Sequence, residues 1–145
     1  MSGCRALVAI LFLLVGFASM GFPRADPDDE KAKALARLSK QKLDSARKTY
    51  EVLWSDYREG FRISDDTLYR WSLRWLEAER QLYKQPADQI VALKEHRDRM
   101  VELEKLIQRV RQVRQATINE VSATEFYRTE ADIWLMQANA DNKGP

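Results

Sequence analysis

The chain has 145 residues, of which 45% are hydrophobic and 32% charged, and this balance predicts one small folded domain rather than a disordered segment. Its formal net charge is +2 at pH 7, but without Arg5 and Arg24, near the N-terminus, 22 basic residues oppose 22 acidic ones. The domain itself therefore gives no reason to expect a general affinity for nucleic acid or anionic lipid. The single cysteine, Cys4, has no second cysteine in the chain with which to form a disulfide.

The first 25 residues have the pattern of a secretory signal peptide. Arg5 precedes the apolar run ALVAILFLLVGFA, residues 6–18, which has 13 residues and is shorter than the roughly 20 that a membrane-spanning helix needs. Cleavage is expected after Ala18, Gly21 or Ala25, with an uncleaved N-terminal anchor as the alternative. We therefore expect an exported protein, periplasmic or associated with the cell envelope, that meets a membrane only through this segment if it is not cleaved.

A helical domain is expected over residues 34–140, preceded by an acidic linker over 26–33 and followed by a frayed tail over 141–145. The first apolar seam alternates steps of three and four residues, which is the heptad spacing of a helix that packs on another helix. Its members are Ala36, Ser39, Leu43, Ala46, Tyr50, Leu53, Tyr57 and Gly60. Gly60 can take the left-handed conformation that ends a helix, and Ser64 can cap the next one.

The next segment concentrates aromatic residues on a second helical seam. Its members are Leu68, Trp71, Trp75, Ala78 and Leu82. Trp71 and Trp75 are one helical turn apart, which favours burial against a partner helix over a ligand pocket. Trp54 and Tyr69 lie off the seams and are expected at an edge or an oligomer contact. The aromatic residues predicted to form helix interfaces are Trp54, Tyr57, Tyr69, Trp71, Trp75 and Trp134.

Two more helices are expected after the break at Pro86. The third seam consists of Leu93, His96, Met100, Leu103, Ile107 and Val110. Thr117 with Glu120 three residues later is the capping-box arrangement that begins a fourth helix. The inward face of that helix is predicted to carry Val121, Thr124, Tyr127, Ala131, Trp134 and Ala138. The pattern predicts an all-α fold of up-down antiparallel hairpins, a four-helix coiled coil or bundle.

The two halves of the helical domain align at an offset of 53 residues. This offset places Ser64 on Thr117 and also superposes apolar positions of the second and fourth helices. It predicts two helix-turn-helix repeats of about 53 residues. Gly60 falls on Val113, which is a mismatch, and heptad helices also align in part by chance.

The first turn and the helix after it resemble a known motif. The segment YREGFRISDDTLYRWSLRWLEAERQLY, residues 57–83, is similar to the helix-turn-helix signature of the TolC family of outer-membrane efflux factors. The matching residues are Tyr57, Gly60, Ser64, Asp66, Leu68, Leu76, Glu77 and Ala78. The second half matches at Thr117, Val121, Glu130 and Ala131 but lacks the glycine. The resemblance is to the helical part of that family, and it implies an envelope protein built from helical hairpins.

Catalytic, cofactor and metal chemistry find little support in the sequence. His96 is the only histidine and lies on a seam, which favours a structural role. A helical di-iron site needs Glu-x-x-His pairs, and none occurs. Glu77 and Glu79 diverge around a helix, and no glycine-rich phosphate loop is present. We therefore expect no enzyme activity, no cofactor and no metal.

Basic residues gather on the third helix. They are Arg97, Arg99, Lys105, Arg109, Arg111 and Arg114. Acidic residues interleave with them, so a solvated face with weak ion pairs is favoured over a phosphate or nucleic-acid site.

Two functional hypotheses remain. The first is a non-enzymatic interaction or assembly module of the cell envelope, whose partner is a helical envelope protein or a second copy of the chain, as the efflux-factor resemblance implies. The second is a soluble ligand- or metal-binding helical bundle in which Trp71, Trp75 or His96 lines a site.

Overall fold

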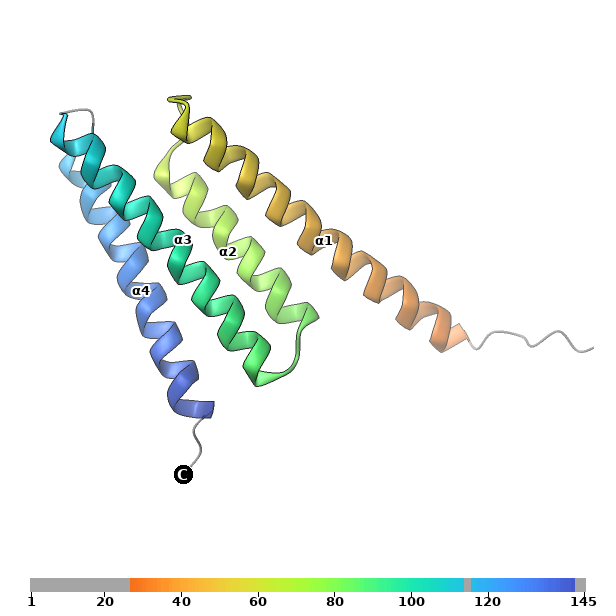
Figure 1. Ribbon diagram of the computed structural model, residues 1–145. Helices are drawn as coiled ribbons and strands as arrows, with labels where there is room; N and C mark the ends of the chain where they lie inside the picture. The colour runs from red at the N-terminus through yellow and green to blue at the C-terminus, as the bar shows by residue number, and fades with distance from the viewer. Residues whose placement is uncertain (1–26, 114–115, 143–145) are drawn as a thin grey trace, which may run out of the picture.

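Four helices form the part of the chain that the computed structural model describes, residues 27–113 and 116–142 (Figure 1). In chain order they are α1 (Pro27–Arg58), α2 (Asp65–Leu82), α3 (Pro86–Gln112) and α4 (Ile118–Asn142). No strand occurs in these two ranges. The predicted all-α architecture is confirmed. The expected signal segment, residues 1–25, lies outside the described residues, as does most of the tail.

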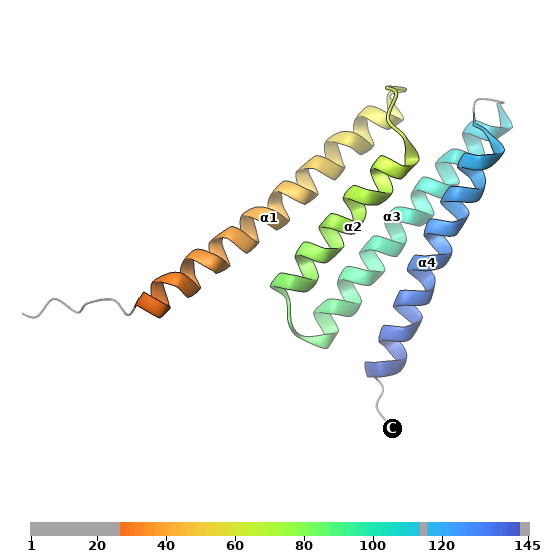
Figure 2. The ribbon, with the colours of Figure 1, turned by 180° about the vertical axis from the view of Figure 1, so that it is seen from behind.

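Helices that are neighbours in sequence are also neighbours in space. α1 packs along α2 and α3 packs along α4, so the molecule consists of two hairpins joined where α2 meets α3. Within the described ranges the backbone of α1 does not come close to α3 or α4. Both views place α1 at one edge of the molecule and α4 at the opposite edge (Figures 1 and 2).

α1 begins at Pro27, so the structure places residues 27–33, which the sequence assigned to an acidic linker, inside the helix. The first turn carries Asp28, Asp29 and Glu30, and negative charge there suits the positive end of the helix dipole. The acidic run therefore starts the helix instead of separating it from the preceding segment.

A glycine in the left-handed conformation ends α1. Gly60 has φ of +90°, and its N–H donates to the carbonyl of Tyr57 at 3.2 Å. The N–H of Phe61 donates to the carbonyl of Asp56 at 3.0 Å. Together these bonds form the Schellman arrangement, which satisfies carbonyls at the helix end that have no partner within the helix.

The other helix ends use side-chain caps or proline. Ser64 Oγ accepts the N–H of Thr67 at 3.1 Å at the start of α2, and Pro86 occupies the first turn of α3. At the start of α4, the N–H of Thr117 donates to Glu120 Oε2 at 2.6 Å and the N–H of Glu120 donates to Thr117 Oγ1 at 3.2 Å. This reciprocal pair is a capping box.

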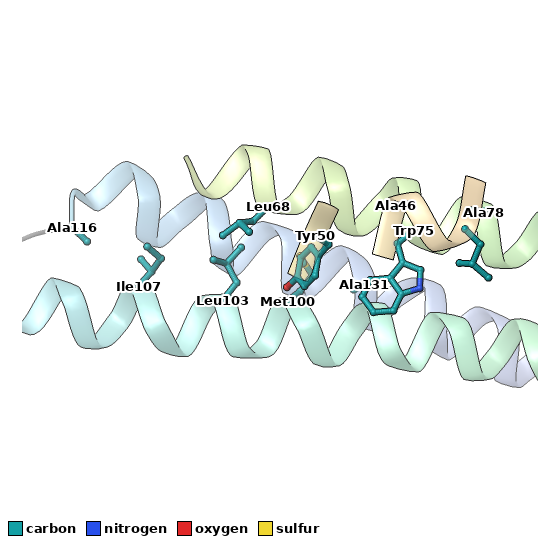
Figure 3. Close-up of a cluster of buried hydrophobic side chains, with 11 residues drawn as sticks. Ala46, Tyr50, Leu68, Trp75, Ala78, Met100, Leu103, Ile107, Ala116 and Ala131 are labelled. Carbon is teal, nitrogen blue, oxygen red and sulfur yellow. The ribbon is translucent and has the colours of Figure 1, made fainter. Parts of the chain in front are cut away.

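The core runs between the helices as one large cluster and one small one. The large cluster joins all four helices and is shown in part in Figure 3; its buried members are Leu43, Ala46, Tyr50, Leu68, Trp75, Ala78, Met100, Leu103, Ile107, Ala116 and Ala131. The small cluster consists of Leu76, Ala92 and Leu93, with three residues of α4 packed against it. α4 contributes only Thr124 and Ala131 as fully buried residues. None of the four described helices is both long and apolar enough to cross a membrane.

The geometry at Gly60 predicts a stability loss in the variant Gly60→Ala. A Cβ at this position would meet no atom within 4 Å, so the cost comes from the backbone conformation alone. We expect the free energy of unfolding in urea to fall by about 1–2 kcal/mol, the range for a non-glycine residue in left-handed backbone. Gly60→Asn is the control and should lose less, because asparagine tolerates this region. Equal stability of all three proteins would contradict the assignment.

Candidate functional site

The aromatic residues predicted for interfaces all make aromatic or cation–π contacts within the chain. Trp54 stacks with Tyr50 at 6.3 Å and with Tyr57 at 6.5 Å, measured between ring centroids along α1. Trp71 is half-buried on α2 beneath the guanidinium of Arg74, which lies 4.5 Å from its ring centroid. These three predicted interface residues, Trp54, Tyr57 and Trp71, therefore keep only part of their surface for an outside partner.

The other predicted aromatic residues join α2 and α3 to α4. Tyr69 stacks on Tyr127 with ring centroids 4.0 Å apart, and its hydroxyl donates to the carboxylate of Glu130. Burial is the main cause that raises the pKa of Tyr69 well above its usual range, and the hydrogen bond to the Glu130 carboxylate is the second. Trp134 of α4 stacks on His96 of α3 at 5.8 Å. Both contacts are internal to the bundle.

Trp75 lies between two arginines that come from different helices. The guanidinium of Arg99 on α3 lies 3.9 Å from the centroid of the Trp75 ring, and that of Arg47 on α1 lies 5.1 Å away. The indole itself is buried, with 9% of its surface exposed. Cation–π contacts of a partly desolvated arginine are worth up to about 2 kcal/mol. Trp75 is therefore the point at which α1, α2 and α3 are held together.

A buried polar network continues from Arg99 into the core. Arg99 Nε donates to Ser72 Oγ at 2.7 Å, and Ser72 Oγ lies 2.8 Å from His96 Nδ1. Because Ser72 already accepts from Arg99, its own hydrogen can be donated to Nδ1 of a neutral imidazole. His96 Nε2 is buried and has no hydrogen-bond partner among the described residues. Burial, together with the positive charge of Arg99, lowers the pKa of His96 to about 3.

A hydrogen-bonded serine and histidine are also the elements of a nucleophilic pair. Here Ser72 and His96 are each 0% exposed, so no substrate reaches either side chain. A histidine with a pKa near 3 is also a weak base at neutral pH. The structure therefore gives this pair the features of a core network. Among the described residues, no group of three or more histidine, cysteine or acidic side chains could hold a metal ion.

An open groove lies between α1 and α3, with Trp75 of α2 on its floor. Its volume is about 670 Å³, and its lining includes Tyr50 and Trp54 from α1 and Arg99 from α3. We call it the α1–α3 groove. The guanidinium of Arg99 is already engaged by Ser72 and Trp75. The groove therefore offers aromatic surface but no free buried charge to select a ligand.

The basic run on α3 does not form one continuous surface. Arg97 Nε is paired with Asp132 of α4 at 2.9 Å, and Lys105 with Glu102 at 3.2 Å. Arg99 points into the core, as described above, and Arg114 lies outside the described residues. The remaining members, Arg109 and Arg111, donate to nearby backbone carbonyls. Each described member of the run thus has at least one partner within the chain.

The outer face of α4 carries a stripe of exposed residues that the sequence analysis did not single out. Its members follow helical spacing and are Ile118, Ser122, Phe126, Thr129, Ile133, Met136 and Ala140. None is charged, and the large apolar members are 48–72% exposed. We call this set the α4 stripe. The sequence analysis missed the α4 stripe because this helix is apolar on two faces and only the inward face was assigned. Seven uncharged residues at helical spacing could have revealed the second face.

The low pKa of His96 predicts a pH-dependent stability. In the unfolded chain this histidine takes up a proton below about pH 6.5, whereas in the folded protein it stays neutral down to a pKa of about 3. Between these two values the unfolded state binds more protons than the folded state, so protonation favours unfolding. The contribution of His96 to the free energy of unfolding is therefore complete above pH 6.5 and is lost progressively as the pH falls. The free energy of unfolding should decrease by up to about 1.4 kcal/mol per pH unit from this group.

The control for this effect is His96→Asn, which keeps a polar atom near Ser72 but cannot titrate. The carboxyl groups of the chain titrate in both proteins and contribute equally to each. The difference between the stability curves of the original protein and the variant therefore isolates His96, the only histidine in the chain. Chemical denaturation between pH 4 and 8 measures it. Parallel curves for the two proteins would show that His96 is not held neutral.

Comparison of the chain with protein-family models, with curated proteins and with solved structures gives no match. The resemblance to efflux-factor hairpins is therefore not tested by these comparisons and stays a prediction.

Proposed function

We propose that this chain is an exported, non-enzymatic helical protein of the cell envelope that acts as a protein–protein interaction or assembly module. The observation that carries the proposal is the α4 stripe. Phe126, Ile133 and Met136 are 60%, 48% and 72% exposed, and they lie in helical register on one face. Single exposed apolar residues are ordinary, but a continuous stripe of them is typical of a surface that a partner covers.

The chemistry of the α4 stripe favours another helix as the partner. The stripe extends over residues 118–140, and its spacing is that of a face that packs against a second helix. It is bordered by Glu125 and Asp132 on one side and Glu130 on the other. α4 as a whole contains five acidic residues and one basic residue, Arg128. Asp132 is already paired with Arg97 and Arg128, and Glu130 accepts from Tyr69. A partner helix with an apolar centre and a basic residue opposite Glu125 would therefore complement this face.

The proposal of an envelope location rests on the sequence. The first 25 residues have the pattern of a secretory signal, and residues 57–83 resemble the hairpin turn of efflux factors. A helical envelope protein, or a second copy of this chain, is therefore the proposed partner. The alternative is a soluble ligand-binding bundle that uses the α1–α3 groove. It is the weaker proposal, because the guanidinium of Arg99 in that groove is already engaged by Ser72 and Trp75.

Photo-cross-linking from the α4 stripe tests the interaction function. We expect the full chain with Met136→p-benzoylphenylalanine to give a discrete protein–protein adduct on irradiation in the cells that produce it. The matched control is Lys105→p-benzoylphenylalanine, on an exposed face of α3, which should give none. Adding Ile133→Glu should abolish the adduct, because a charge placed in the apolar stripe opposes docking.

The folding of these variants must stay unchanged for the test to hold. Ile133 and Met136 are exposed, so substitutions there should alter the free energy of unfolding by no more than about 0.5 kcal/mol. Circular dichroism during denaturation checks this. If Met136 and Lys105 give the same adducts, or Ile133→Glu has no effect, the α4 stripe is not a docking surface.

The export proposal has a separate test. Mass spectrometry of the protein isolated from a cell-envelope or periplasmic fraction should find the mature chain beginning at Ser19, Phe22 or Asp26. An intact start in the membrane fraction would indicate the uncleaved anchor. A protein with Met1 or Ser2 first in the cytosolic fraction would contradict export altogether.

A further inference from the structure

α1 also carries a stripe that the other described helices leave largely exposed. Its members alternate steps of four and three residues and are Lys31, Leu35, Leu38, Lys42, Ser45, Thr49 and Val52. Leu35, Leu38 and Val52 are 65%, 55% and 51% exposed. We call this set the α1 stripe. It extends over residues 31–52, almost the same length as the α4 stripe at residues 118–140.

The N-terminal part of α1 reaches beyond the bundle. Lys42 Nζ donates to Gln81 Oε1 at 2.9 Å, next to the C-terminal end of α2, so the residues of α1 before this point have no α2 beside them. Every residue from 28 to 38 is exposed. Both ribbon views show this end of α1 diverging from the other helices (Figures 1 and 2). Leu35 and Leu38 therefore stay uncovered in a single molecule. A partner packed against this part of α1 would remove their apolar surface from water.

The charges in and beside the two stripes differ in sign: they are basic along the N-terminal part of the α1 stripe and acidic at the borders of the α4 stripe. Between Lys31 and Lys42 there are five basic residues and no acidic one. α4 has the reverse balance, and Glu125 at the border of its stripe forms no ion pair within the part of the chain that the structure describes. Pairing either stripe with itself would bring like charges together, which costs free energy at a helix interface. Pairing one with the other brings opposite charges together.

We infer that the partner of the α4 stripe is the α1 stripe of a second copy of this chain. The inference rests on the proposed function and names the partner for it. Because α1 and α4 lie at opposite edges of one molecule, they cannot meet within it. The contact is therefore head-to-tail. A copy in contact with one neighbour keeps one stripe free, so a pair of copies keeps a free α1 stripe at one end and a free α4 stripe at the other. Such an interface closes into a ring or continues as an open chain of copies.

Arg37 and Glu125 are the residues that should set the electrostatic match. Arg37 borders the α1 stripe on the side away from the core seam, and Glu125 borders the α4 stripe. Lys40 has the same charge and is also exposed, but it lies three residues later, about 60° further round the helix from the α1 stripe than Arg37. Arg37 and Lys40 are thus a matched pair, of which only Arg37 belongs to the inferred interface.

Site-resolved cross-linking between isotopically distinct copies tests the inference. Full-length chain with Leu38→p-benzoylphenylalanine is mixed with ¹⁵N-labelled full-length chain and irradiated. We expect the adduct to join the unlabelled α1 to a labelled peptide from residues 118–142. Identifying the two cross-linked peptides by mass spectrometry distinguishes this contact from any association through the apolar residues 6–18.

Charge reversal then separates a specific interface from chance contact. Arg37→Glu should lower the yield of the α1–α4 adduct about tenfold, because an attractive pair becomes a repulsive one. Lys40→Glu should leave the yield unchanged. Combining Arg37→Glu in the cross-linking copy with Glu125→Arg in the labelled copy should restore it. All three positions are exposed, so circular dichroism should show equal folding.

Several results would overturn the inference. Adducts from Leu38 to the α1 of another copy, equal loss of adduct in Arg37→Glu and Lys40→Glu, or no rescue by Glu125→Arg would each do so. If Met136 cross-links to a different protein while Leu38 gives no adduct with another copy, self-assembly fails but the interaction function stands. If neither position gives an adduct, both fail.

Discussion

The guanidinium of Arg99 joins the two hairpins of this molecule. It lies over the ring of Trp75 and donates to Ser72, so a single side chain of α3 binds two positions on α2. Ser72 in turn lies 2.8 Å from His96, which extends the link into the core. Sliding α3 along α2 by one turn would leave these buried polar groups unpaired, at about 1–3 kcal/mol for each. The network therefore fixes the register of α2 on α3, which apolar contacts alone specify poorly.

The features that the sequence predicts well depend on residues close together in the chain. The four helices follow from heptad spacing, and the breaks follow from the chemistry of Gly60, Ser64, Pro86 and Thr117, whose roles are set within one turn of each residue. Trp75 shares the seam with Leu68 and is buried with it. Such features require knowing which face of a helix is apolar, but not which helix that face meets.

What the sequence does not reveal depends on which helices become neighbours. Arg99 belongs to a run of alternating charges, and nothing near it in the chain shows that it alone turns inward onto Trp75 and Ser72. On α4 the inward face was predicted correctly, since Thr124 and Ala131 are buried, and what the sequence analysis did not single out is the second apolar face, which the packing leaves exposed. The prediction of a linker at residues 27–33 was wrong for a different reason: acidic residues are suited both to linkers and to the first turn of a helix.

The pairing of helices that adjoin in sequence has a consequence for how the chain reaches this structure. Each hairpin closes across a connection of only a few residues, so its contacts have a low contact order and little loop-closure entropy opposes them. α1 and α2 can bury Leu43, Ala46 and Ala78 against one another before α3 and α4 are available. Because synthesis begins at the N-terminus, the first hairpin can fold before the second, and the Arg99 contact then joins the second hairpin to the first.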